Sequence, residues 1–272
     1  MDAGLRIPAE RMEVNGLGLV VETEGDGPPI LLVHGFPLDR TMWRHQMDAL
    51  VGWRRIAPDL RGMGLSDAPD LGYSMAAYAE DLLQLLDRLE VDQAVLCGLS
   101  MGGYVAFELL RRARSRFRGL ILMDTRAEAD TPEGRRGREA MATAVRERGA
   151  SAVAEALLPK LTAPGALEAD PELAGRVRRM IEGTPVPGIL GALTAMKDRP
   201  DSTDLLPSLA GLPTLVLGGD EDAITPPDGM AALAKAIPGA RLEVIEGAGH
   251  LAPMERPEAT TRAVRGFLTG LV

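Results

Sequence analysis

One serine in this sequence lies in a glycine-flanked turn that suits nucleophilic chemistry. Ser100 is the centre of a Gly-x-Ser-x-Gly pattern that it forms with Gly98 and Gly102. The apolar run 94–97 before it predicts a buried strand, and residues 104–110 after it predict a helix. A strand, this pattern and a helix together predict a sharp, strained turn that presents the serine hydroxyl at a helix N-terminus. Backbone amides at that position favour developing negative charge.

A serine hydroxyl needs a base before it is a good nucleophile, and the sequence contains only three histidines. His45 falls in a predicted amphipathic helix and is interpreted as a surface residue. His34 follows an apolar run, so we expect it to shape the next loop at the edge of a substrate pocket. His250 lies in a glycine-rich loop after the last predicted strand. We therefore expect His250 to take the proton from Ser100.

The histidine in turn needs a carboxylate to orient it, and strand ends are the useful places. In one known order of this triad the acid lies between the serine and the histidine. Asp124 follows one predicted strand, and Asp220, Glu221 and Asp222 follow the next. We favour Asp222, which lies just before a proline turn, over Asp220 and then Asp124.

Acyl transfer also requires donors for an oxyanion and walls for a substrate pocket. We expect the donors to be the backbone amides of Met101, directly after the serine, and Phe36, in the loop after an earlier strand. Arg126 could bind a substrate carboxylate if it faces inward, although a surface arginine is the simpler interpretation. Apolar residues of the helical segment that follows are the further candidates for the pocket, and these are Leu158, Ile189, Leu190 and Leu193.

The predicted elements alternate in the way that would bring these residues to one edge of a sheet. Residues 12–22 predict a hairpin around Asn15-Gly16, and the buried strands are expected at 30–33, 54–58, 94–97, 119–123, 214–217 and 242–245. The helices are expected at 40–50, 74–89, 104–110, 228–237 and 257–268, the third capped by the serine turn. We therefore predict an α/β fold with a mostly parallel, doubly wound sheet of about eight strands and an N-terminal hairpin.

The alternation stops in a segment rich in arginine, alanine and proline. Residues 127–207 predict several short helices and no strand. We interpret 127–207 as a helical cap (lid) inserted into a core domain made of residues 1–126 and 208–272.

Composition excludes several classes of function. The chain has 272 residues, is 46% hydrophobic and carries a formal net charge of −9. This charge argues against a nucleic-acid binder and gives no support for docking on anionic membranes. No signal-peptide pattern begins the sequence, no apolar run could span a bilayer, and the single cysteine allows no intrachain disulfide. We expect a cytoplasmic monomer or small homo-oligomer that needs no metal or other cofactor.

Four segments resemble the marker segments of the α/β-hydrolase superfamily. They are His34-Gly35-Phe36-Pro37-Leu38-Asp39, the segment Asp59 to Asp67, Gly98 to Gly103, and Gly249 to Glu255. The resemblance covers nearly the whole chain except the expected cap. Within the superfamily the sequence is most similar to small bacterial carboxylesterases and the 3-oxoadipate enol-lactonase branch. Ser100, Asp222 and His250 match the triad of that superfamily.

The resemblance implies a serine carboxylesterase that cleaves small to medium acyl esters through an acyl-enzyme. Lactone hydrolysis, C–C bond hydrolysis and perhydrolysis by the same triad stay open, and so does a non-catalytic small-molecule receptor on this scaffold. Haloalkane dehalogenases and epoxide hydrolases resemble the same scaffold but place aspartate at the nucleophile position, so Ser100 argues against both.

Overall fold

The computed structural model describes residues 9–271, and its centre is one twisted sheet of eight strands in the order β1-β2-β4-β3-β5-β6-β7-β8. The contacts of β2 with β1 and β4 are antiparallel, and all other neighbours are parallel. The strands are β1 (Ala9–Val14), β2 (Leu17–Glu24), β3 (Pro29–Val33), β4 (Arg54–Pro58), β5 (Ala94–Leu99), β6 (Phe117–Met123), β7 (Thr214–Gly219) and β8 (Arg241–Ile245). The predicted fold class, with its N-terminal hairpin, is confirmed.

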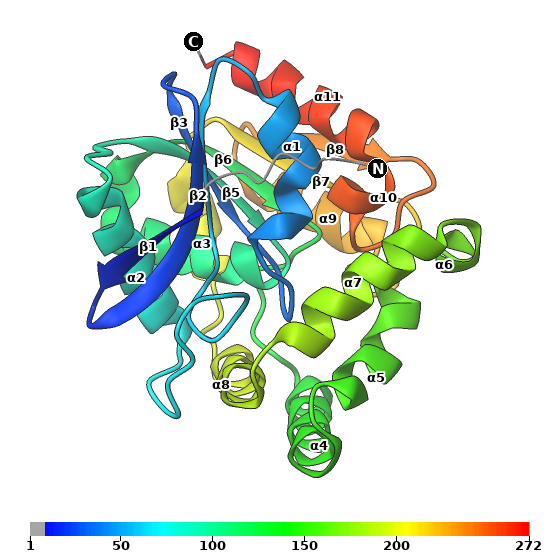
Figure 1. Cartoon of the computed structure of the whole chain (residues 1–272). Helices are drawn as coiled ribbons and strands as arrows, with labels where there is room; N and C mark the ends of the chain where they lie inside the picture. The colour runs from blue at the N-terminus through cyan, green and yellow to red at the C-terminus, as the bar shows by residue number, and fades with distance from the viewer. Residues whose placement is uncertain (1–8, 272) are drawn as a thin grey trace, which may run out of the picture.

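Helices cover both faces of this sheet (Figure 1), with α2 and α3 on one face and α1 and α11 on the other. The central strand β5 is accordingly buried along its whole length, which explains its uninterrupted apolar run. The helices before and after residues 127–207 are η1 (Arg40–Trp43), α1 (Arg44–Ala49), α2 (Met75–Arg88), α3 (Met101–Ala113), η2 (Arg114–Arg116), α9 (Pro227–Ala236), α10 (Ala252–Glu255) and α11 (Pro257–Thr269).

Local sequence signals explain where several elements begin and turn. Asn15 and Gly16 both have positive φ values, 51° and 73°, as the two-residue turn of the β1–β2 hairpin requires. The Ser74 side chain accepts a hydrogen bond from the Ala77 amide and caps α2. The single helix expected over 40–50 is instead a 3₁₀ turn followed by α1. Asp39 and Asp59 accept hydrogen bonds from the amides of Thr41 and Arg40, which holds this first turn.

Between β6 and β7 the chain forms a group of helices beside the sheet (Figure 1, green to yellow). They are α4 (Pro132–Arg148), α5 (Ser151–Leu161), α6 (Ala166–Ala169), α7 (Pro171–Gly183), α8 (Val186–Lys197) and η3 (Thr203–Leu209). Residues 127–207, all of them described, contain no strand. The division of the chain into a core and a cap with these boundaries stays a proposal.

This group of helices packs closely on the loops that follow β3 and β4. A Cβ atom added at Gly188 of α8 would lie 1.7 Å from the Gly62 carbonyl oxygen, so the two backbones are in direct contact. The Thr184 hydroxyl donates to the Pro37 carbonyl at 3.1 Å. Arg199 is nearly buried, pairs with Asp130 at 2.6 Å and stacks over the Tyr104 ring of α3.

No helix among the described residues is long and apolar enough to cross a membrane. The interpretation that the sequence begins without a signal peptide concerns Met1 to Arg6, which lie outside the described residues.

Candidate active site

The turn between β5 and α3 holds Ser100 in a backbone conformation that non-glycine residues rarely adopt. Its φ is 53° and its ψ is −114°. The Ser100 amide donates to the Met123 carbonyl at 2.9 Å, and the Thr125 hydroxyl donates to the Ser100 carbonyl at 2.8 Å. A Cβ atom on Gly102 would lie 2.2 Å from the Val33 carbonyl oxygen. The glycine therefore lets α3 begin against the end of β3.

His250 connects Ser100 to a carboxylate through its two ring nitrogens. The His250 Nε2 atom lies 2.8 Å from the Ser100 Oγ atom, and His250 Nδ1 lies 2.8 Å from Asp222 Oδ2. His250 is 2% exposed, whereas Ser100 is partly exposed. Nucleophilic catalysis by a serine requires this arrangement, in which an imidazole lies beside the hydroxyl and a carboxylate lies beside the imidazole.

Asp222 is strongly held in the loop after β7. Its Oδ1 atom accepts hydrogen bonds from the amides of Ile224 at 2.7 Å and Thr225 at 3.0 Å, and its Oδ2 atom accepts one from the Thr225 hydroxyl. Burial opposes ionisation of Asp222, but the hydrogen bonds from His250 and Thr225 outweigh it and lower the pKa of this carboxyl to about 2. Asp222 is therefore ionised throughout the neutral pH range.

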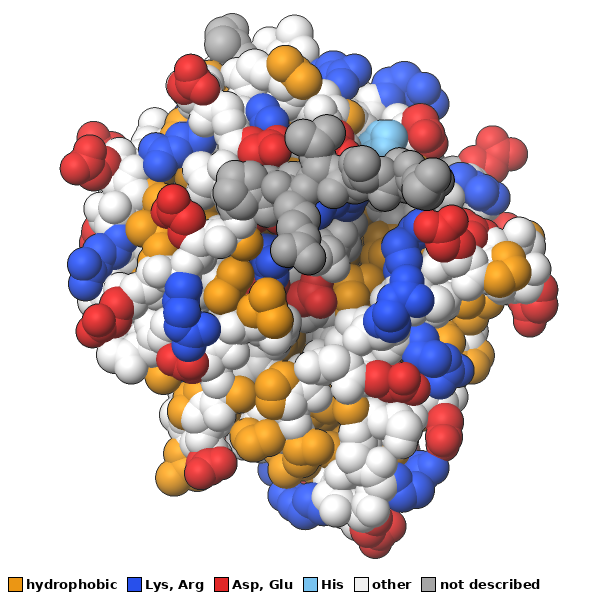
Figure 2. Space-filling model, in the orientation of Figure 1, with side chains coloured by type: hydrophobic (Ala, Val, Ile, Leu, Met, Phe, Trp, Pro, Cys, Tyr) orange, Lys and Arg blue, Asp and Glu red, His pale blue; other side chains and the backbone are white. Residues whose placement is uncertain are grey.

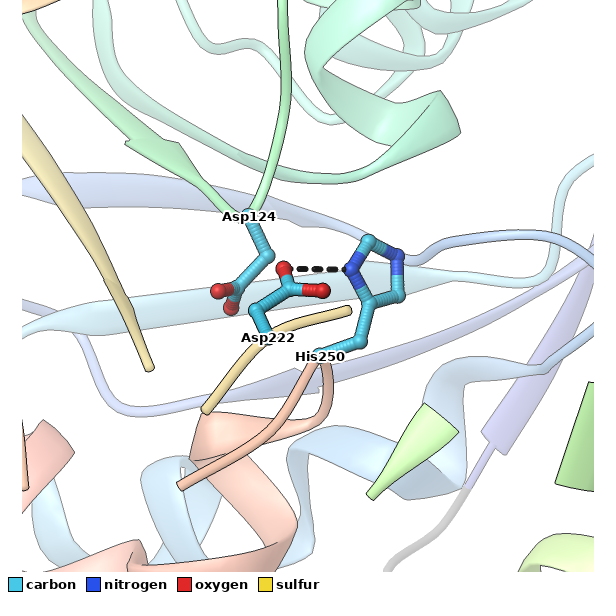
Figure 3. Close-up of side chains that lie close together, drawn as sticks. All are labelled: Asp124, Asp222 and His250. Carbon is cyan, nitrogen blue, oxygen red and sulfur yellow. Dashed lines mark hydrogen bonds and ion pairs between the residues drawn. The ribbon is translucent and has the colours of Figure 1, made fainter. Parts of the chain in front are cut away.

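The other candidate acids make no hydrogen bond to His250 in the described structure. Asp220 and Glu221 are exposed, and Asp220 accepts the Gly247 amide at 2.7 Å. Asp124 is buried beside Asp222, and ligand atoms of the two carboxyl groups lie within 4.8 Å of one another (Figure 3). Of the candidates considered from the sequence, Asp222 is the one that contacts the histidine.

Two backbone amides beside Ser100 are free to donate. Neither the Phe36 nor the Met101 amide donates a hydrogen bond to any described residue. Met101 begins α3, and the loop that carries Phe36 lies against the serine, since a Cβ atom on Gly35 would be 3.3 Å from the Ser100 Cβ atom. Buried amides without a partner are uncommon in proteins.

His34 is held inside the loop that follows β3 by hydrogen bonds to the backbone, and its place at a substrate pocket stays a prediction. It is fully buried, its Nδ1 atom lies 2.9 Å from the Gly35 carbonyl oxygen, and its Nε2 atom accepts the Leu60 amide at 3.0 Å. Burial lowers its pKa despite the nearby Asp59 carboxylate, so His34 is held neutral.

The other expected pocket residues differ in their surroundings. Arg126 donates to the Ile224 carbonyl and lines a cavity of about 330 Å³ with Thr225 and Pro226. Leu158 of α5 and Ile189 and Leu193 of α8 are buried, and Leu190 is half-buried against the core. Their assignment to a substrate pocket stays a prediction.

Two residues that the sequence interpretation missed, Thr225 and Glu255, hold the loops that carry Asp222 and His250. Thr225 donates to Asp222 and lies 3.2 Å from His250 Nδ1. Glu255 accepts the amides of Gly249 at 3.0 Å and Leu251 at 3.3 Å on either side of His250, and the amide of Ala163 at 2.7 Å from the end of α5. The spacing Asp222-x-x-Thr225 is an Asx-type turn signal that points to the first of them.

One cluster of potential metal ligands also occurs here. Ligand atoms of Asp124, Asp222 and His250 all lie within 4.8 Å of one another. Both ring nitrogens of His250 take part in hydrogen bonds, so a metal ion would have to replace one of them.

Comparisons with known proteins agree with this arrangement. The family model for the alpha/beta hydrolase fold matches residues 28–257. The structure of a thermophilic esterase from Thermogutta terrifontis, with malate bound, is 45% identical, covers 97% of this chain and 99% of its own, and superposes with a TM-score of 0.93. The enol-lactonase from Burkholderia xenovorans LB400 is 32% identical over 96% of this chain and 100% of its own, with a TM-score of 0.88. In sequence, 3-oxoadipate enol-lactonase 2 from Acinetobacter baylyi is 27% identical over 90% of each chain.

Proposed function

Since this chain belongs to the α/β-hydrolase fold family and is a hydrolase with esterase and enol-lactonase relatives, we propose that it is a serine carboxylesterase. Its substrates are small to medium acyl esters. The observation that supports this proposal is the continuous hydrogen-bonded path from Ser100 through His250 to Asp222, in which each contact between side chains is 2.8 Å long.

The proposed reaction has two halves, acylation of Ser100 and hydrolysis of the acyl-enzyme, and the same groups act in both. Ser100 Oγ attacks the ester carbonyl carbon while His250 Nε2 takes its proton, and the amides of Phe36 and Met101 bind the oxyanion. His250 then gives the proton to the departing alkoxide, leaving an acyl group on Ser100. A water molecule, deprotonated by the same nitrogen, attacks this ester. His250 then returns the proton to Ser100 Oγ as the acyl–oxygen bond breaks and the carboxylic acid leaves. Asp222 holds the imidazole in orientation throughout.

The direct test is a panel of p-nitrophenyl esters together with a fluorophosphonate label. We expect hydrolysis of the short and medium esters and one label on Ser100, with both lost in Ser100→Ala. Stoichiometric binding of esters without turnover, and no label on Ser100, would overturn the proposal in favour of the receptor interpretation.

A second candidate, hydrolysis of lactones or esters that carry a carboxylate, is favoured by a positively charged groove. Two adjoining cavities of about 350 and 280 Å³ are both lined by Arg44, Arg176 and Met254, and Arg179 lines the larger one. Figure 2 shows the blue side chains of Lys and Arg gathered over α7 beside this hollowed surface. Met254 belongs to α10, which follows the His250 loop in the chain, and guanidinium groups bind carboxylates through two parallel hydrogen bonds.

The test compares a neutral ester with an ester of similar length that ends in a carboxylate. If the groove selects anions, Arg176→Gln and Arg179→Gln each raise KM for the anionic ester by on the order of tenfold. KM for the neutral ester stays unchanged. The matched control is Arg178→Gln, because Arg178 lies on the same helix, pairs with Glu182 and lines neither cavity. Equal KM values for both esters in all variants would remove this candidate.

A further inference from the structure

The Asp124 carboxyl group is buried without a positive partner. Asp124 follows β6, is 0% exposed, and adopts a positive φ of 45°. Its Oδ1 atom accepts the Gly219 amide at 3.0 Å, and its Oδ2 atom has no hydrogen-bond donor among the described residues. Within the described chain it forms no ion pair. A lone buried carboxylate is costly, so this group needs another explanation.

The neighbouring strand leaves room for this carboxyl. A Cβ atom on Gly218 of β7 would lie 2.4 Å from Asp124 Oδ1 and 2.1 Å from the Met230 sulfur. An alanine at position 218 would therefore displace the carboxyl or the methionine. The positive φ at Asp124 directs its side chain toward β7, and the absence of a side chain at Gly218 leaves a compartment there for one carboxyl group.

The charged and titratable groups around this compartment are mainly acidic. Asp222 and His250 lie within 4.8 Å by their ligand atoms (Figure 3), and Glu255 from α10 adds a more distant negative charge. Burial raises the pKa of Asp124 well above its usual range, and the Asp222 carboxylate raises it further. Asp222, in contrast, accepts hydrogen bonds from two amides, a hydroxyl and the imidazole. The two environments favour opposite protonation states.

We propose that Asp124 is a positioning residue that stays protonated at the working pH and donates a hydrogen bond to Asp222, so that the buried pair carries one negative charge. The proposal rests on the proposed function only in that Asp222 orients the catalytic histidine. The donated hydrogen bond fixes the rotation of the Asp222 carboxylate from the side opposite His250. It also gives the buried Asp124 carboxyl a partner that it otherwise lacks on its Oδ2 side.

The pH dependence of kcat/KM in Asp124→Asn tests whether Asp124 is protonated in the wild type. The readout is whether the midpoint of the acid limb shifts. Asparagine replaces a neutral donor with another neutral donor, so the midpoint of the acid limb stays where it is in the wild type. If Asp124 were instead ionised, the substitution would remove a negative charge that stabilises the imidazolium. The limb would then move to lower pH by about one unit or more, and the proposal would be wrong.

A second substitution tests the hydrogen bond itself. Asp124→Val removes the donor at similar volume, and we expect kcat to fall by on the order of tenfold, with Asp124→Asn restoring most of it. Asp220→Asn, an exposed change of the same charge near the triad, is the control. Equal losses of kcat in the valine and asparagine variants would contradict a role as donor.

A readout that needs no activity separates this proposal from the proposed function. Denaturant unfolding is measured against pH for the Ser100→Ala protein and for the same protein with Asp124→Asn added. When folding raises the pKa of a carboxyl, the folded protein loses stability as the pH rises above the pKa that this carboxyl has in the unfolded chain. The protein that keeps Asp124 should therefore lose about tenfold in its folding constant per pH unit relative to the asparagine variant, from near pH ~4 upward. If the free energies of unfolding of the two proteins ran parallel against pH, the proposal would be wrong even if the protein were an esterase. If their difference changed with pH as expected, the proposal would hold even if no ester were cleaved.

Discussion

At the scale of single residues, the side chains of Ser100, His250 and Asp222 form a continuous chain of contacts. Ser100 is fixed by its strained turn, His250 by two ring hydrogen bonds, and Asp222 by two backbone amides. Such preorganisation means that the groups need little rearrangement during a reaction. Small changes that keep the fold but remove one contact should therefore have measurable effects on the rate.

Asp222→Asn should lower kcat by several orders of magnitude, on the order of 10⁴-fold, because the imidazole loses its correct tautomer and the charge that stabilises its protonated form. Steady-state kinetics on a p-nitrophenyl ester measure the loss, and circular dichroism checks the fold. Asp220→Asn serves as the control and should change kcat little. If Asp124→Asn were inactive and Asp222→Asn active, the orienting acid would instead be Asp124, at the end of β6.

Thr225→Val should lower kcat/KM by on the order of tenfold, since the isosteric side chain no longer donates to the ionised Asp222. Thr203→Val is a matched control, because the Thr203 hydroxyl donates to Asp201 in the same way at an exposed position far from the triad in sequence. The kinetics of both variants are compared with one ester. Equal rates for Thr225→Val and the wild type would show that the two amides alone position Asp222.

At the scale of elements, the site depends on contacts between loops that follow different strands. β3 and β5 are neighbouring parallel strands, so the Phe36 loop and Ser100 meet at one edge of the sheet. The end of α5 lies on the His250 loop, because a Cβ atom on Gly249 would be 2.4 Å from the Ala163 nitrogen. The segment between β6 and β7 is thus in contact with the His250 loop as well as with the loop that carries Phe36.

Glu255 joins two of these elements, and its removal should affect the rate and the mobility of the His250 loop together. Glu255→Ala leaves three amides without an acceptor, and we expect a loss of stability of about 1–3 kcal/mol and faster hydrogen exchange at residues 162–163 and 249–251. Glu255→Gln keeps one acceptor oxygen and should lie between. Glu246→Ala, an exposed change in the same loop region, is the control. Exchange rates at 249–251 that do not change would show that the loop is held by other contacts.

At the scale of the whole molecule, the buried acids give stability a defined dependence on pH. Because the pKa of Asp222 is lowered to about 2 on folding, the unfolded chain binds more protons than the folded one below the usual carboxyl range. The stabilisation from Asp222 is complete above about pH 4 and is lost as pH falls through about 2. From the shift, its size is about 2 kcal/mol.

We therefore expect the wild type to be more stable than Asp222→Asn by about 2 kcal/mol near neutral pH, with the difference shrinking as pH falls from about 4 toward 2. Urea unfolding at a series of pH values measures it, and Asp220→Asn supplies the baseline for loss of an exposed charge. A difference that is constant over this range would mean that Asp222 is not stabilised as a carboxylate by folding.

Much of the architecture was determined by the sequence itself. Continuous apolar runs such as 94–99 can be buried only between two layers of helices, and Asn15-Gly16 accepts the positive φ values of a tight hairpin. The Gly-x-Ser-x-Gly pattern at 98–102 likewise determined the strained turn, because its glycines alone permit the backbones to approach so closely. The family and the fold class are confirmed, while the roles of Ser100, Asp222 and His250 stay predictions.

Only the tertiary structure decided which of several acids contacts His250 and which polar groups surround it. Asp124, Asp220 and Asp222 each follow a strand that ends at the same edge of the sheet, so the sequence could rank them, with Asp222 first, but could not show their contacts. Their different roles depend on side-chain placement over a few ångströms: Asp220 is exposed, Asp222 contacts the imidazole, and Asp124 is buried beside Asp222. Glu255 reaches the His250 loop and the end of α5 at once for the same reason. Contacts between residues far apart in the chain are set by packing, which local sequence patterns do not encode.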